Sequence, residues 1–237
     1  MTGRPWSFVV TAEHGGNVVP PEYAHLFSGA EKTLASHHGW EPGTLALAEQ
    51  LSSALKAPFL SSTVTRLLVD LNRSPHHPRV CSEFTRSLDR CARNDLITKW
   101  HSPHRAAVQE TVEGQARRGR RVLHLGIHSF TPVLNGVRRK PDIALLYDPA
   151  QLAELTLAKR WAVALGSAIP DFVIRRNDPY RGTSDGLTTM LRRALQAVTY
   201  LGFEIEINQR LLGADGNFAT HIGSTLFGTL GETLAHL

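Results

Sequence analysis

Two histidines follow apolar segments at points where the chain is expected to leave a sheet. His14 lies in the stretch EHGGN, directly after the β-branched run of residues 7–12, and His128 ends the apolar run 122–128. Each could be a turn or core histidine, but two imidazoles at one sheet edge could also bind a metal. A catalytic zinc site uses a third protein ligand and leaves one position open. Candidates for that ligand are Glu41, His37, His38 and Glu13.

Two glutamates alternate with apolar residues in the segment 203–207 (FEIEI). A strand's period of two puts Glu204 and Glu206 on one face and the apolar residues on the other. On an exposed edge strand this is ordinary amphipathic patterning. In a sheet covered on both faces the carboxylates need partners, because unpaired burial is costly. Water at a metal and nearby arginines would supply them, and one glutamate would then be a natural general base.

Three further segments carry polar side chains, and two of them allow either a structural or a functional interpretation. Glu41 directly precedes Pro42, where a carboxylate can cap a helix or point back at the loop that bears His14. The stretch 70–74 (DLNRS) is either a capped turn or a place where Arg73 holds a substrate carboxylate through two parallel hydrogen bonds. The stretch 177–182 (NDPYRG) has the composition of a surface loop.

The elements that must position these residues alternate along the chain. The apolar patterning predicts strands at residues 7–12, 63–71, 122–128, 143–147, 172–174 and 203–207. It predicts helices at residues 42–56, 102–121, 150–167, 186–199 and 223–235. This alternation favours an α/β layered fold with a largely parallel sheet. Ligands of such sheets bind beyond the carboxyl ends of the strands, so we expect one active site at that edge.

Length and composition limit the class of protein. The 237 residues are 42% hydrophobic and 20% charged, which is enough for one sizeable core, and we expect a single domain over residues 1–237. No apolar run approaches the roughly 20 residues of a membrane span, and residues 1–5 lack the layout of a signal peptide. Two cysteines do not make a disulfide scaffold. These features together predict a cytoplasmic protein with no membrane partner.

The charge balance points to an acidic partner. The chain has 26 Lys plus Arg against 21 Asp plus Glu, a net charge of +5, and arginine supplies most of the positive charge. Either nucleic acid or a small acidic substrate fits this balance. Aromatic residues are only 7% and do not interleave with the basic runs as stacking surfaces would. We therefore favour the small acidic substrate and keep a basic nucleic-acid-binding module as the alternative from another class.

Taken together, six of these segments resemble the N-formylglutamate amidohydrolase family. They occur in the family's order and extend from Phe8 to about Leu212. They are residues 13–17 (EHGGN) followed by Pro20, 38–43 (HGWEPG), 70–74 (DLNRS), 128–132 (HSFTP), 177–180 (NDPY) and 204–209 (EIEINQ). The family often has Asp where this chain has Glu41, so the acidic ligand is kept in type but has a longer reach.

The resemblance implies a zinc-dependent amidohydrolase with a three-layer α/β/α fold and a mostly parallel mixed sheet, similar to zinc carboxypeptidases and muramoyl-alanine amidases. The implied zinc ligands are His14, Glu41 and His128, with Glu206 as the base and Glu204 as the second choice. The implied substrate-binding residues are Asn17, Asn72, Arg73, Tyr180 and Arg181.

The reaction implied in this way is hydrolysis of an N-acyl acidic amino acid. The first expectation is N-formyl-L-glutamate, cleaved to formate and L-glutamate, as in histidine catabolism. The alternative is a zinc amidase or peptidase that acts on another N-acyl amino acid or a small peptide.

Overall fold

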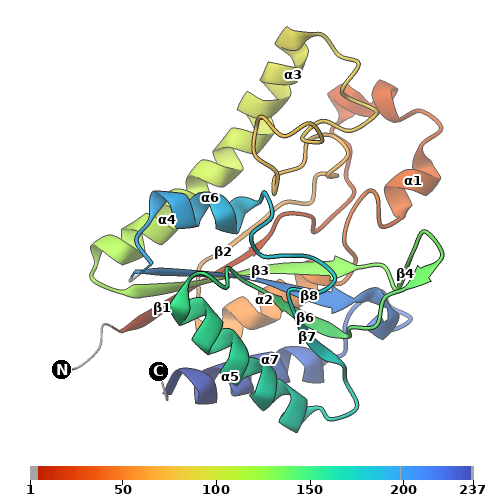
Figure 1. Cartoon of the computed structure of the whole chain (residues 1–237). Helices are drawn as coiled ribbons and strands as arrows, with labels where there is room; N and C mark the ends of the chain where they lie inside the picture. The colour runs from red at the N-terminus through yellow and green to blue at the C-terminus, as the bar shows by residue number, and fades with distance from the viewer. Residues whose placement is uncertain (1–4, 198, 236–237) are drawn as a thin grey trace.

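A six-stranded sheet forms the centre of the computed structural model, which describes residues 5–197 and 199–235 (Figure 1). The strand order is β2-β1-β3-β8-β6-β7. The strands are β1 (Trp6–Ala12), β2 (Phe59–Ser61), β3 (Arg121–Phe130), β6 (Ile143–Leu146), β7 (Ile174–Arg176) and β8 (Tyr200–Asn208). Only the β6–β8 pair is antiparallel among these neighbours, so the prediction of a mostly parallel mixed sheet is confirmed.

Helices cover both faces of this sheet and complete the predicted three layers (Figure 1). One face carries α2 (Thr44–Leu55), α5 (Leu152–Ala168) and α7 (Thr220–Ala235), and the other carries α4 (Ser102–Arg117) and α6 (Leu187–Ala194). The larger core lies under α2, α5 and α7, where Leu125 and Phe203 pack against Trp161. Burial of such side chains is the main favourable contribution to folding. Within the described residues, none of the helices is both long and apolar enough to span a membrane.

The alternation of side chains along the strands decides which residues reach the site. Ile127 and Ile205 join the core beneath α2, α5 and α7, so His128, Glu204 and Glu206 face the opposite side of the sheet. The parallel register places His128 of β3 directly beside Glu206 of β8. The predicted shared face of Glu204 and Glu206 therefore becomes part of one polar edge.

Smaller elements surround that edge. A 3₁₀ helix (Pro21–Phe27), α1 (Glu31–Ala35), α3 (Arg90–Leu96) and a π-helical turn (Ile97–His101) lie in the long connections on the side of α4 (Figure 1). A hairpin of β4 (Val133–Leu134) and β5 (Val137–Arg138) projects after β3, and a second 3₁₀ helix (Gln209–Leu211) follows β8. None of these short elements was predicted from the sequence.

One predicted strand is wrong. Residues 63–71 form turns, with only an isolated bridge between Val64 and Val18. Their apolar side chains are buried away from the sheet, where Leu67 and Leu68 pack against Phe27. Burial in a separate cluster produces the same apolar run as a buried strand, which is why the pattern misled.

Several other predicted boundaries shift, and the helix expected at 102–121, for example, ends at Arg117. The helix expected at 186–199 ends at Ala194, with Val198 outside the described residues, and the strand expected at 172–174 lies at Ile174–Arg176. The single domain over residues 1–237 stays a prediction.

Candidate active site

Three buried side chains from separate parts of the chain meet at the carboxyl edge of the sheet. His14 follows β1, Glu41 precedes α2 and His128 lies in β3; we call them the His-Glu-His cluster. One potential ligand atom from each lies within 4.8 Å of the others. The Nδ1 atoms of His14 and His128 lie 2.9 Å from Oε1 and Oε2 of Glu41, respectively. The cluster therefore presents two imidazole nitrogens around one carboxylate.

The backbone before α2 brings Glu41 to this position. Its amide donates to the carbonyl of His14 over 2.9 Å, which ties the two loops together. Gly43 then starts α2 with φ of 81°, a left-handed conformation that favours glycine. A Cβ on Gly43 would lie 2.7 Å from side-chain atoms of Leu212 and Phe218, so a larger residue would push the loop away from the cluster.

The outer nitrogens of both imidazoles face further carboxylates. His14 Nε2 lies 2.8 Å from Asp70 Oδ1, and His128 Nε2 lies 3.4 Å from Glu13 Oε2. Arg66 joins the cluster by donating to Glu41 over 2.7 Å and to Asp70 over 2.9 Å. Carboxylates behind metal-binding histidines fix the ring orientation and raise the basicity of the ligand.

Charge pairing inside the cluster shifts the titration of its members. Burial alone would raise the pKa of Glu41, but the neighbouring His14 and His128 hold it well below its ordinary value. Burial and the Arg66 charge would lower the pKa of His14, but Glu41 and Asp70 outweigh them and raise it. Burial also opposes the shift at His128, where Glu41 is the main cause of a strongly raised pKa.

This donor set fits a divalent cation such as zinc. A histidine, a carboxylate and a second histidine are a ligand combination that zinc accepts in catalytic sites. The pairing of each distal imidazole nitrogen with a carboxylate is the support that such ligands need. Among the residues that the structure describes, His14, Glu41 and His128 form the one group with ligand atoms this close together.

The two glutamates of β8 lie beside the cluster in different surroundings. Glu206 is buried, and its Oε2 atom makes no hydrogen bond with any residue that the structure describes. Burial, with the negative charges of Glu41 and Glu204, raises the pKa of Glu206 to about 8 against the pull of His128. Glu204 instead accepts hydrogen bonds from Thr188 over 3.2 Å and from Asn72 over 3.5 Å. Glu206 thus has an oxygen available for chemistry.

A cavity of about 160 Å³, the inner cavity, connects these groups to the expected substrate-binding residues. Asn72, Arg73, Tyr180 and Arg181 line it together with the His-Glu-His cluster, Glu204 and Glu206. The side-chain oxygen of Asn72 also accepts a hydrogen bond from the backbone N–H of Leu187 over 2.7 Å, which joins the loop 70–74 to α6. Four of the five expected substrate residues therefore line this cavity, and their contact with substrate stays a prediction.

Asn17 is not among the residues that line this cavity, and its contact with substrate stays a prediction. Its side chain donates to the carbonyl of Leu34 over 3.1 Å and holds α1 in place. His37 and His38 are also outside the cluster, with ring centroids 4.1 Å apart in a neighbouring cavity.

Around the His-Glu-His cluster, sequence reasoning assigned no role to Arg66 or Asp70, and it considered Glu13 only as a candidate third ligand rather than as the carboxylate behind His128. Asp70 belongs to the segment 70–74 that was already noted, and Glu13 adjoins His14. The signal that could have found both is the need of each metal-binding histidine for a carboxylate behind it.

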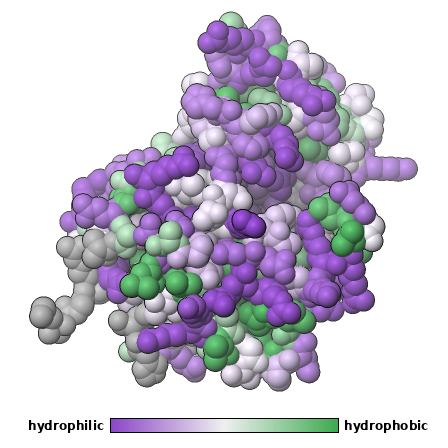
Figure 2. All heavy atoms as spheres, in the orientation of Figure 1, coloured by the Kyte–Doolittle hydropathy of each residue, from purple (hydrophilic) through white to green (hydrophobic). Residues whose placement is uncertain are grey.

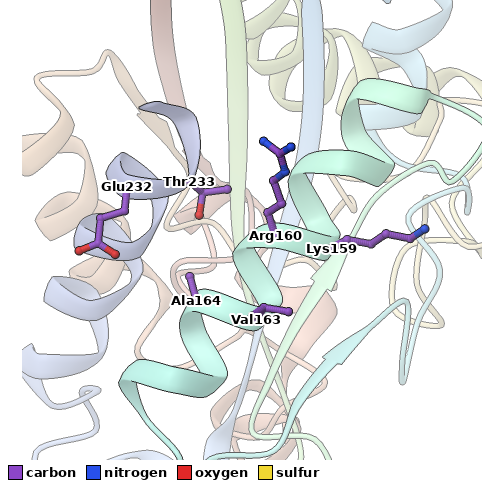
Figure 3. Close-up of a pocket in the computed structure, with 6 residues that line it drawn as sticks. All are labelled: Lys159, Arg160, Val163, Ala164, Glu232 and Thr233. Atoms are coloured by element: carbon purple, nitrogen blue, oxygen red, sulfur yellow. The ribbon is translucent and has the colours of Figure 1, made fainter. Parts of the chain in front are cut away.

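A cavity of about 640 Å³ lies elsewhere, between α5 and α7 (Figure 3). Its walls are Lys159, Arg160, Val163, Ala164, Glu232 and Thr233. Its described lining residues include no histidine and a single carboxylate, which is not a metal-binding set. The polar cavity at the sheet edge, in contrast, is lined by the His-Glu-His cluster and both glutamates of β8.

Comparison with solved structures identifies chains of similar fold. The gene product Atu2144 from Agrobacterium tumefaciens is 28% identical, with a TM-score of 0.82 over 97% of this chain and 91% of that one. The N-formylglutamate amidohydrolase from Ralstonia eutropha JMP134 is 19% identical, with a TM-score of 0.65 over 99% and 93%. The amidase AmiC2 of Nostoc punctiforme aligns over 97% of each chain at 11% identity and a TM-score of 0.44.

The sequence itself carries a family signature. No protein with a curated description matches it. The profile of one family, N-formylglutamate amidohydrolase, matches residues 6–212, which include the His-Glu-His cluster, both glutamates of β8 and the walls of the inner cavity. With that match over most of its length, the chain belongs to the N-formylglutamate amidohydrolase family.

Proposed function

We propose that this chain is a zinc-dependent amidohydrolase that converts N-formyl-L-glutamate and water to formate and L-glutamate. One observation carries the proposal: the buried His-Glu-His cluster shares a cavity with Glu206, whose Oε2 atom makes no hydrogen bond with any described residue. Membership of an amidohydrolase family supports the reaction class. The arginines of the cavity wall support an acidic substrate.

The residues proposed to hold zinc are His14, Glu41 and His128. When bound, zinc supplies Lewis acidity that polarises the scissile carbonyl and lowers the pKa of water, and its positive charge favours the ionised form of Glu206. Arg66, bound to Glu41 and Asp70, keeps both carboxylates in place. Asp70 and Glu13 keep the two imidazoles oriented toward the metal.

Glu206 is the proposed general base. Its Oε2 atom would accept a proton from the attacking water and pass it to the nitrogen of the leaving amino acid. Glu204 is the weaker candidate, because its carboxylate already accepts bonds from Thr188 and Asn72. A role in holding Asn72 and α6 at the cavity suits Glu204 better.

Substrate carboxylates are proposed to meet Arg73 and Arg181 in the cavity wall. Among the described residues, the Arg73 guanidinium makes only long contacts, 3.4 Å to the carbonyl of Asp185 and 3.9 Å to Asp70, which leaves it able to take a carboxylate. Tyr180 accepts a hydrogen bond from Arg139 over 2.8 Å, which holds its ring in the cavity wall. Cytoplasmic location and a part in histidine catabolism stay predictions.

Release of a free amino group, common to all three substrates below, tests the proposal directly, with formate measured in addition for the formyl substrate. Purified protein would be stripped with a chelator, reloaded with zinc, and given N-formyl-L-glutamate, N-acetyl-L-glutamate or a muramoyl peptide. We expect formate release that depends on zinc and is lost in His14→Ala. If formyl-glutamate is the poorest of the three substrates, or if stripped protein keeps full activity, the proposal is wrong.

A further inference from the structure

A second cavity, the outer cavity, adjoins the inner cavity, and the proposed reaction leaves it unused. The outer cavity measures about 470 Å³, and its walls share Glu41, Arg66, Arg73 and Tyr180 with those of the inner cavity. Small-molecule sites usually measure roughly 300–1,000 Å³. The inner cavity, at about 160 Å³, falls below that range. A substrate longer than a single amino acid would therefore extend into the outer cavity.

Positive charge dominates the walls of the outer cavity. Five arginines line it: Arg66, Arg73, Arg79, Arg86 and Arg139. Of the acidic residues there, Glu41 and Asp70 already bind Arg66 and His14, which leaves Glu83 at the exposed rim. The outer cavity thus has more cationic groups than its own carboxylates can pair.

Two of these arginines have no side-chain partner among the described residues. The guanidinium groups of Arg79 and Arg86 make no hydrogen bond or ion pair with residues 5–197 or 199–235, and both side chains are exposed. Unpaired guanidinium groups in a concave wall raise the local concentration of anions. Their planar fork matches a carboxylate through two parallel hydrogen bonds.

The outer cavity also has an apolar side. Leu67, Phe130 and Leu134 contribute to its walls, and Leu134 lies in the β4–β5 hairpin. Val133 and Val137 of this hairpin are 48% and 68% exposed, and hydrophobic atoms appear at its position on a largely hydrophilic face (Figure 2). Apolar walls beside arginines suit the methylene groups of an acidic side chain together with its carboxylate.

We propose that the outer cavity is a subsite for a second acidic residue, so that the preferred substrates are N-formylated acidic peptides. This inference rests on the proposed function and extends it to a longer substrate. The second residue's carboxylates would reach Arg79 and Arg86 while the formyl group lies at the His-Glu-His cluster. Water would add its hydroxyl to the formyl carbon as the C–N bond breaks, giving formate, and the freed amino group of the peptide would take the proton.

Three substrates separate length from charge: N-formyl-L-glutamate, N-formyl-L-glutamyl-L-glutamate and N-formyl-L-glutamyl-L-glutamine. We expect zinc-loaded protein to show a kcat/KM about tenfold higher for the glutamyl-glutamate peptide than for its glutamine counterpart. The preference should decline as salt rises from 50 to 500 mM, because salt screens exposed charges.

The double variant Arg79→Ala/Arg86→Ala should reduce the ratio of these two kcat/KM values to near one. Arg118→Ala/Arg120→Ala makes the same change in charge at exposed positions before β3, and it should keep the wild-type ratio. Equal rates for the two peptides in wild type, or an unchanged ratio in the first double variant, would overturn the inference. If only formyl-glutamate is hydrolysed, the proposed function stands and the inference is wrong. If none of the three releases formate, both fail.

Discussion

Asp70→Asn tests whether the carboxylate behind His14 supports the metal ligand. Asp70 Oδ1 contacts His14 Nε2 at 2.8 Å and accepts from the Asn72 amide at 3.0 Å, while Oδ2 accepts from Arg66 at 2.9 Å. Asparagine keeps an oxygen for the first two contacts and loses the negative charge and the acceptor for Arg66. Arg66 remains bound to Glu41 over 2.7 Å, so the loop should hold its shape.

The expected loss is therefore in metal affinity rather than in folding. Removing the support behind a metal-binding histidine costs about 10- to 100-fold in affinity. Because one hydrogen bond to His14 is kept and the charge is lost, we expect zinc affinity to fall about 30-fold, or about 2 kcal/mol. Saturating zinc should restore most of kcat, since the change acts through the ligand and leaves Glu206 in place.

Competition between the protein and a chromophoric chelator measures the zinc dissociation constant. Asp148→Asn is the matched control, because it makes the same change in charge at a carboxylate that accepts from Ala150 over 2.9 Å outside both cavities. Circular dichroism shows whether each variant is folded. A folded Asp70→Asn protein with zinc affinity within twofold of wild type would refute the role assigned to Asp70.

Three further predictions concern the base, the ligands and a buried histidine. Glu206→Gln should bind zinc normally but lose about 100- to 10,000-fold in kcat for formate release, with a smaller loss in Glu204→Gln; equal losses would contradict the assignment of the base. Zinc binding at pH 7 should release protons, because metal-free His14 and His128 have raised pKa values. Calorimetry in buffers of different ionisation enthalpy detects that release, and its absence would contradict the charge pattern. Burial lowers the pKa of His124 from 6.5 to about 4. As pH falls from 6.5 to about 4, the unfolded chain therefore binds a proton that the folded chain does not, and the free energy of unfolding decreases, by about 3 kcal/mol once both states are protonated. Denaturant unfolding of metal-free wild type and His124→Gln at several pH values measures this effect. The decrease in the free energy of unfolding that is due to His124 should appear in wild type and be absent from the variant.

The elements predicted correctly are those whose pattern can be seen in neighbouring residues of the sequence. The strand predicted at 122–128 lies in β3, where continuous burial gives a run of apolar residues. The alternating segment 203–207 lies in β8, where the period of two is visible in the sequence. The turns at 63–71 were missed because an apolar run does not say which surface it packs against. The hairpin β4–β5 has only two residues in each strand and leaves no comparable pattern.

The site residues also fall into two groups: those in local sequence motifs and those that only the fold brings together. His14, Glu41 and His128 stand in motifs that a sequence displays, whereas the pairing of His14 with Asp70 joins residues 56 positions apart. No local pattern reports such a contact. The bond of Asn17 to the carbonyl of Leu34 is likewise set by the fold, and the family motif that suggested a substrate contact does not report it. The outer cavity is also a product of tertiary structure, since its walls join the segment 66–86 to His37, Phe130 and Arg139 from other parts of the chain.

The central claim is that His14, Glu41 and His128 together hold the catalytic metal. A crystal structure of the zinc-loaded protein, with anomalous scattering recorded on both sides of the zinc absorption edge, tests this claim most directly. The account predicts a single strong anomalous peak within bonding distance of the Nδ1 atoms of His14 and His128 and of the Glu41 carboxylate. A peak held by other residues, or the absence of zinc from this cluster in active protein, would contradict it.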